Sequence, residues 1–168
     1  IIPSLMPRYP VLDVAKTVRS LQIQSGASLG LGGFNLTLSS NAVIAGGLNA
    51  TGTETVTFQR EVDFTGGSFT PVRSTVVIGG SQAQTVNPAG LSFLKFYVTN
   101  RTATVTFSGG LSAAEFRCEA TNGLPSMTFQ QGATYAIRDF VLLGSTTATN
   151  VTLRSSNTGQ TWNLNLLG

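Results

Sequence analysis

The sequence contains no histidine, and its 168 residues include a single cysteine, Cys118. The absence of histidine excludes the triads that pair a serine or cysteine nucleophile with an imidazole base, and it excludes the common zinc ligand sets. One cysteine cannot form an intrachain disulfide, so the fold must be stable without such a bond. We expect Cys118 to be a small buried apolar residue.

Charged residues are also scarce. They make up 10% of the chain, whereas globular domains average about 25%. No apolar run approaches the roughly 20 residues of a membrane-spanning helix, and the basic residues are scattered rather than gathered into a stripe with aromatic residues, so we expect no membrane span and no nucleic-acid partner. The surface must therefore be covered by neutral Ser, Thr, Asn and Gln side chains. Such surfaces are common on extracellular β-proteins, and we expect an extracellular or cell-surface location.

Carboxylates are few, and two pairs of them lie close together in the sequence. These pairs are Glu61 with Asp63 and Glu115 with Glu119. A glycosidase needs two carboxyl groups about 5 to 10 Å apart across a cleft, but each pair has an arginine next to it, as expected for a solvated patch with local ion pairs. The chain has no calcium-loop or phosphate-loop motif. We therefore expect no enzymatic activity, no catalytic residues, no metal and no cofactor.

From residue 20 onward, short apolar–polar–apolar triplets alternate with glycine-rich corners. In a strand such a triplet places two apolar side chains on one face. Glycine pairs such as Gly32-Gly33 allow the positive φ that a sharp corner needs. The triplets include Leu21-Gln22-Ile23, Leu36-Thr37-Leu38, Val56-Thr57-Phe58, Val105-Thr106-Phe107, Met127-Thr128-Phe129 and Val151-Thr152-Leu153.

An internal repeat gives the period of this pattern. Residues 20–31, SLQIQSGASLGL, match residues 126–137, SMTFQQGATYAI, and Phe34 and Phe140 share the same offset of 106 residues, about five times 21. A period of about 21 suits one coil of a right-handed parallel β-helix, with three short strands per coil and about 4.8 Å between coils. We predict an all-β, right-handed parallel β-solenoid over residues 20–168. The alternative is an antiparallel β-sandwich or jelly roll, whose strands recur about every 8 to 12 residues.

The first 19 residues differ from the rest, because three prolines interrupt their apolar side chains. We predict an extended N-terminal arm over residues 1–19, with a short strand or turn at residues 13–19. The arm either caps one open end of the solenoid or adds to the edge of a neighbouring subunit. The C-terminal segment 162–166 is alternating, β-prone and uncharged. The expected assembly residues are Ile1, Ile2, Leu5, Met6, Tyr9 and Val11 in the arm and Trp162, Leu164 and Leu166 near the C-terminus.

Two stretches resemble the repetitive segments of large secreted bacterial β-helix proteins of the surface or adhesin type. They are SLQIQSGASLGLGGFNLTLSSNAVIAGGL and FQQGATYAIRDFVLLGSTTATNVTLRSSNTGQTWNLNL. The resemblance implies export, surface exposure and an adhesive or scaffolding role, and it supplies no catalytic motif.

These observations favour a non-enzymatic extracellular structural protein that assembles with itself into a fibre or surface matrix through head-to-tail β contacts that involve the arm. The alternative is an adhesin or a carbohydrate-binding module of a larger secreted protein, with surface glycans as its partner. Glycan binding usually uses exposed aromatic rings. It would be favoured if Tyr97, Tyr135 and Trp162 lined one exposed face.

Overall fold

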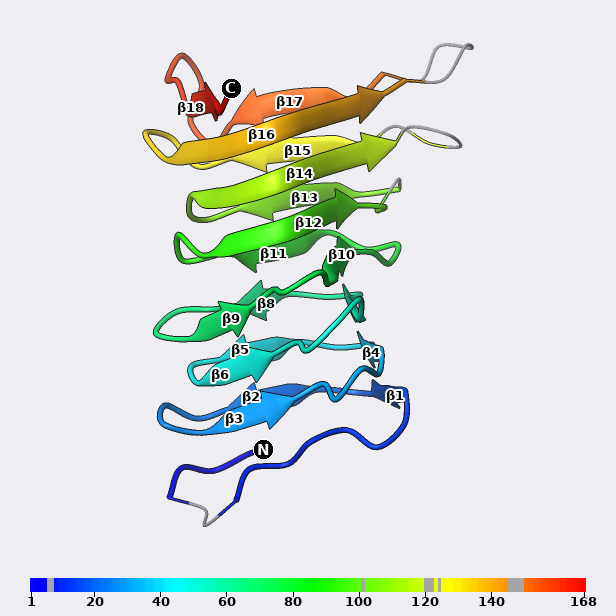
Figure 1. The fold of residues 1–168 in the computed structure, drawn as a ribbon. Helices are drawn as coiled ribbons and strands as arrows, with labels where there is room; N and C mark the ends of the chain where they lie inside the picture. Colours follow the sequence, from blue (N-terminus) through cyan, green and yellow to red (C-terminus); the bar gives the residue numbers. More distant parts are fainter. Residues whose placement is uncertain (6–7, 101, 120–122, 124, 145–149) are drawn as a thin grey trace.

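The apolar–polar–apolar triplets form the strands of a parallel β-solenoid. The computed structural model describes residues 1–5, 8–100, 102–119, 123, 125–144 and 150–168. The regular secondary structure of these residues consists of strands alone, and every strand pair is parallel. The strands at the front of Figure 1 run to the right and those at the back run to the left as the chain climbs from N to C, which is the right-handed sense. The predicted solenoid is confirmed, and the antiparallel sandwich is wrong because each coil pairs in parallel with the next.

The coils stack to form three sheets. The eight-stranded sheet contains β1 Lys16–Val18, β4 Leu36–Leu38, β7 Thr55–Phe58, β10 Thr75–Ile78, β12 Ser92–Val98, β14 Leu111–Glu119, β16 Thr134–Leu143 and β18 Asn163–Leu166. The seven-stranded sheet contains β2 Leu21–Ile23, β5 Ala42–Ile44, β8 Val62–Asp63, β11 Gln84–Asn87, β13 Thr104–Phe107, β15 Ser126–Phe129 and β17 Thr152–Ser155. The three-stranded sheet contains β3 Ser28–Gly30, β6 Gly47–Asn49 and β9 Ser68–Thr70.

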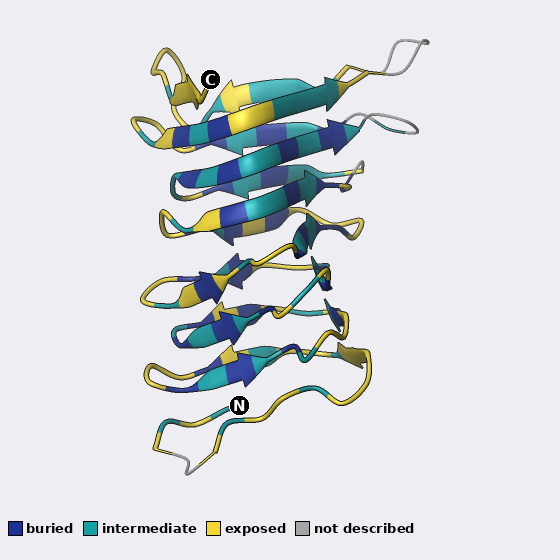
Figure 2. Cartoon of the chain, in the orientation of Figure 1, coloured by how far each residue is buried: buried dark blue, intermediate teal, exposed yellow. Residues whose placement is uncertain are grey.

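The core consists of ladders of inward-facing side chains, shown by the alternation of buried and partly exposed positions in Figure 2. Each inward residue stacks on its partner in the next coil, so apolar surface is covered above and below as well as from the opposite sheet. Complete burial of one such side chain stabilises the fold by about 1.5–3 kcal/mol. Cys118 is fully buried in one ladder, as expected. In the eight-stranded sheet a second ladder runs through Leu36, Val56, Val76, Phe96, Phe116 and Phe140.

The two repeated segments occupy coils of the same solenoid, but strand pairing aligns them two residues away from the sequence match. The sequence match pairs Leu21 with Met127, whereas strand pairing carries Leu21 over five coils to Phe129, 108 residues later. A slip of two residues keeps every side chain on its own face, so the alternating pattern alone does not detect it. Phe34 and Phe140 are not equivalent either, because Phe140 continues the ladder of Leu36 and Phe34 is 37% exposed.

The cross-section changes along the axis, because one corner is lost. In the first coil, residues 30–35 separate Leu29 of the three-stranded sheet from Leu36 of the eight-stranded sheet. In the fourth coil only two residues separate the inward Phe93 from Phe96, and both rings lie in β12. The shorter corner fuses two faces into one, so β12, β14 and β16 lengthen to 7, 9 and 10 residues.

Candidate functional site

The N-terminal arm lies along the first coil of its own chain (Figure 1). Ile2 forms a parallel bridge with Ile23 of β2, and Val11 forms one with Gly30 of β3. The Ile2 N–H donates to the Gln22 carbonyl at 2.7 Å, and the Gly30 N–H donates to the Pro10 carbonyl at 3.0 Å. The arm therefore covers part of the edges of β2 and β3.

Side-chain contacts hold the middle of the arm. The Tyr9 hydroxyl donates to the Gly26 carbonyl at 2.5 Å, and the Ser4 N–H donates to the Gln24 side-chain oxygen at 3.1 Å. Gly32 allows the backbone of the arm at Leu12 to lie close to the first coil, because a Cβ on residue 32 would lie 2.5 Å from the Leu12 carbonyl oxygen. The arm is thus fitted to this coil.

Much of the arm's apolar surface remains in solvent. Ile1 is 82% exposed, Leu5 is 95% exposed and Val11 is 64% exposed, whereas Ile2 and Tyr9 are partly buried against the core. Met6, the remaining arm residue predicted for assembly, lies outside the described residues. These exposed apolar side chains lie at the N-terminal end of the solenoid.

At the opposite end, Trp162 packs onto the last layer of the core. Its ring stacks on Phe129 with 4.2 Å between centroids and an interplanar angle of 23°, and it meets the Tyr135 ring edge-on at 5.7 Å. Tyr135 is fully buried, and burial raises the pKa of its hydroxyl to about 12 although that oxygen accepts the Gln130 N–H. Trp162 therefore covers the aromatic side chains of Phe129 and Tyr135 at the C-terminal end of the core.

Leu164 and Leu166 occupy core-facing ladder positions without being buried. They pair with Tyr135 and Ile137 of β16, and both of those residues are fully buried. Leu164 is nevertheless 37% exposed and Leu166 is 60% exposed. Among the described residues, no strand lies on the far side of β18. Those predicted assembly residues that the structure describes thus lie at opposite ends of the solenoid, not in one site.

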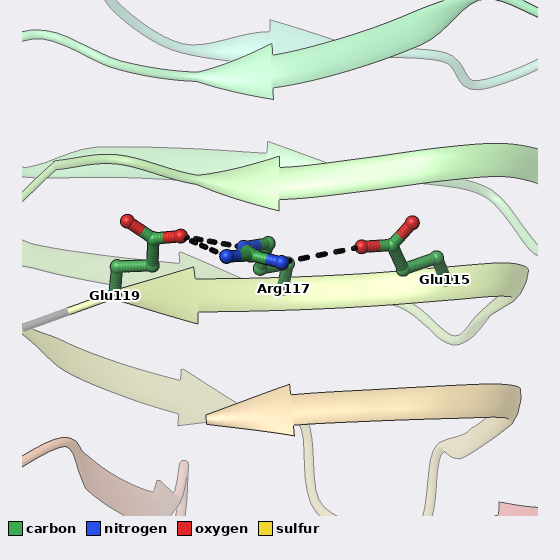
Figure 3. Close-up of polar contacts among 3 residues, drawn as sticks. All are labelled: Glu115, Arg117 and Glu119. Atoms are coloured by element: carbon green, nitrogen blue, oxygen red, sulfur yellow. Dashed lines mark hydrogen bonds and ion pairs between the residues drawn. The ribbon is translucent and has the colours of Figure 1, made fainter. Parts of the chain in front are cut away.

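The outer face of the eight-stranded sheet carries a row of charged side chains (Figure 3). Arg117 lies between two carboxylates of its own strand, β14. Its Nη2 lies 2.5 Å from Glu119 Oε1 and its Nη1 lies 3.8 Å from Glu115 Oε1. The hydrogen bond to Glu119 raises the pKa of the Arg117 guanidinium, and burial together with Glu115 raises the pKa of neighbouring Tyr97. The sequence prediction of local ion pairs is confirmed for Glu115 and Glu119, whereas Arg60 makes no ion pair with Glu61 or Asp63 among the described residues.

Sequence reasoning missed a buried carboxylate, Glu54, which is 2% exposed. Its Oε1 accepts the N–H and hydroxyl of Thr51 at 2.7 and 2.8 Å, and its Oε2 accepts the Gly52 N–H at 2.7 Å. Burial alone would raise the pKa of this carboxyl, but the hydrogen bonds lower it to about 2. The run Thr51-Gly52-Thr53-Glu54 is a turn signal, although nothing in it indicates burial.

Two further buried polar residues, Gln84 and Asn100, lie inside the coil stack. The Asn100 side-chain N–H donates to Gln84 Oε1 at 2.8 Å, and Gln84 in turn donates to the Phe58 and Arg60 carbonyls, each at 3.1 Å. Gln84 thereby ties its own coil to the backbone of the preceding one. Because all of these bonds satisfy buried polar groups, we assign Glu54, Gln84 and Asn100 a structural role.

The three candidate aromatic residues do not share an exposed face. Tyr135 is fully buried and Trp162 stacks on the core, whereas Tyr97 lies on the outer face of the eight-stranded sheet beside Arg117. The arrangement that would favour stacking of sugars on a row of rings is therefore not found.

The part of the chain that the structure describes contains no cluster of three or more His, Cys, Asp or Glu side chains arranged to hold a metal ion. The same residues include no helix of the length and apolarity required to cross a membrane. Comparison of the chain with protein-family models, curated proteins and solved structures gives no match. The resemblance to bacterial surface proteins is thus supported only at the level of the solenoid fold.

Proposed function

We propose that this protein is a non-enzymatic extracellular structural subunit that assembles head to tail with further copies of itself into a fibre or surface matrix. The observation that carries the proposal is the exposure of Leu164 and Leu166 at ladder positions that are buried in the preceding coil. A coil stacked on β18 would bury both side chains, and a second copy supplies that coil.

The backbone of β18 supports this arrangement. The Asn163 and Leu167 N–H groups donate to the Ala133 and Ile137 carbonyls on the β16 side. Because alternate residues of a strand direct their backbone groups to opposite sides, Leu164 and Leu166 present theirs away from β16. An unpaired strand edge of this kind is a template for another chain.

The arm offers a matching edge at the other end. The Pro10 carbonyl and the Leu12 N–H both bond Gly30, so the N–H and C=O of Val11 point away from the chain's own first coil. The edge of β18 in one copy would then pair with Val11 of the next. Such a contact joins two different surfaces, and it therefore propagates instead of closing into a pair.

The test is negative-stain electron microscopy and light scattering of the purified chain at near-neutral pH. We expect fibres whose subunit repeat is about 30–45 Å, the height of the coil stack. The Leu164→Asn/Leu166→Asn double variant should shift the protein to monomers. Val43→Asn, which makes a similar change on an outer face where Val43 is 43% exposed, should assemble normally. A wild-type protein that stays monomeric at every concentration would contradict the proposal.

The role of the arm is tested with two proline substitutions. Val11→Pro removes an outward N–H and spares the arm's own bonds, so it should weaken assembly at unchanged thermal stability. Leu12→Pro removes the donor to Gly30 and should release the arm. If Val11→Pro assembles like the wild type, assembly does not use this edge of the arm.

A further inference from the structure

A shallow groove runs along the outer face of the seven-stranded sheet, over β5, β8, β11 and β13. Two rows of side chains form its walls, Asn41, Glu61 and Thr85 on one side and Asp63, Asn87 and Ser108 on the other. Strand pairing places the residues of each row one above another in successive coils. Neighbours within a row are therefore about 4.8 Å apart along the axis, and the rows are about 7 Å apart across the strands.

The walls are polar and include no cation. They consist of carboxylates, amides and hydroxyls, and no lysine or arginine lines the groove among the described residues. This composition disfavours phosphate, sulfate and anionic polymers, which need basic partners. It suits a ligand with many hydroxyl groups, because a carboxylate or an amide oxygen accepts hydrogen bonds from such groups.

Some of these side chains are already held in place. The Thr65 N–H and hydroxyl donate to Asp63 Oδ1 at 2.9 and 2.6 Å, and Asn87 donates to the Thr65 hydroxyl at 2.8 Å. On the other wall, Asn41 donates to Glu61 Oε2 at 3.3 Å. Each carboxylate keeps its second oxygen without a hydrogen bond among the described residues. Groups fixed in this way lose little freedom when they bind a ligand.

The groove also has an apolar side chain in contact with solvent. Val43 is 43% exposed in the same row as Asp63, and the buried Ala42 and Val62 lie beneath the groove. A pyranose ring presents hydroxyls at its rim and C–H groups on its faces, so it matches polar walls around a small apolar patch. The repeat of the rows along the axis suits an extended chain of such rings.

We propose that this groove binds an extended neutral glycan, whose hydroxyl groups are bound by Glu61, Asp63 and Thr85. The proposal is independent of self-assembly, since the groove lies on a side face and not at an end of the solenoid. Because no aromatic ring lines the groove, binding by one copy should be weak, with a dissociation constant in the roughly millimolar range.

The test uses an array of immobilised neutral and acidic oligosaccharides, followed by calorimetric titration with the neutral hexasaccharide that binds best. We expect neutral glycans to bind and acidic ones to bind less. The Glu61→Gln/Thr85→Val variant should lose about tenfold or more in affinity, the effect of a charged and a neutral hydrogen bond. The control Thr37→Val/Thr57→Val, on the outer face of the eight-stranded sheet, should bind like the wild type, and both variants should keep the wild-type melting temperature.

Three results would overturn the proposal. They are no binding to any neutral glycan, equal binding by the groove variant and the wild type, and binding of calcium ions alone or of a lysine-rich peptide at these residues in place of the glycan. The last result would identify the groove as a cation site.

Discussion

Glu54 accepts a hydrogen bond from the backbone N–H of Gly33, 21 residues earlier in the chain, at 2.9 Å. The same carboxylate binds Thr51 and Gly52 of its own coil, so one side chain joins the corners of two successive coils. The backbone of Glu54 reaches the third coil as well, because its carbonyl accepts the Thr75 N–H at 2.9 Å.

The first prediction concerns acid stability. Since the pKa of Glu54 is lowered from 4.5 to about 2 on folding, its stabilising effect is complete above pH 4.5 and is lost as the pH falls toward 2. This difference corresponds to about 3 kcal/mol. We expect the free energy of unfolding, measured in urea from pH 7 to pH 2.5, to fall steeply below pH 4.5.

The matching variant is Glu54→Gln. Its free energy of unfolding at pH 7 should be lower by a similar amount, and that free energy should fall much less below pH 4.5 than in the wild type. The exposed Glu61→Gln should change neither the stability at pH 7 nor its fall in acid. A wild-type protein whose stability is flat between pH 4.5 and 2.5 would show that the Glu54 carboxylate contributes little.

The second prediction concerns the buried amides. Asn100→Leu removes the donor to Gln84 Oε1 and to the Gln82 carbonyl. Each buried group left without a partner costs about 1–3 kcal/mol, so we expect a loss of about 2–5 kcal/mol in urea unfolding. The control Asn165→Ala, on the exposed strand β18, should stay within about 0.5 kcal/mol of the wild type. Equal effects of the two variants would contradict a structural role for Asn100.

Two adjacent glycines should respond differently to alanine. A Cβ at Gly67 would overlap the Ile44 carbonyl oxygen, whereas Gly66 has a φ of +75° and nothing within 4 Å of such an atom. Gly66→Ala should cost about 1–2 kcal/mol, and Gly66→Asn should cost less because asparagine tolerates this φ. Gly67→Ala should cost more than either, as measured by thermal unfolding. The reverse order would mean that backbone conformation, not coil contact, limits this corner.

The fourth prediction uses the single tryptophan of the chain. Trp162 reports on the C-terminal coil, where all four residues of β18 are exposed. Few buried contacts mean low local stability, so the fluorescence change should come at a lower urea concentration than the loss of far-UV circular dichroism. Coincident transitions would show that this coil unfolds together with the rest. The measurement requires dilute monomer, because assembly would protect the coil.

Strand positions and the coil period could be predicted from the sequence because both are local. Each triplet such as Val105-Thr106-Phe107 carries its own alternation, and the 106-residue repeat reports the average coil. The alignment of Leu21 with Phe129, five coils later in the same ladder, could not be predicted. A two-residue slip in strand pairing leaves the same side chains facing inward.

The polar interactions depend on stacking and were therefore harder to predict. Glu54 has a turn-like local sequence, and its burial follows from the coils above and below it. The sequence shows that Glu61 and Asp63 lie close together, but Asn41, Thr85 and Asn87 join them only through the pairing of β5, β8 and β11. Local patterns thus predict the coils, and the strand register between coils decides which side chains meet.

Because every strand pair in the described residues is parallel and joins one coil to the next, the hydrogen bonds between coils lie along the solenoid axis. A pulling force applied to the two ends would therefore load one coil interface at a time, as in unzipping, instead of shearing many bonds together. Each rupture would free one coil of about 21 residues, or roughly 70 Å of extended chain. The solenoid should lengthen in small, repeated steps at modest force, and it should yield first at its least buried end.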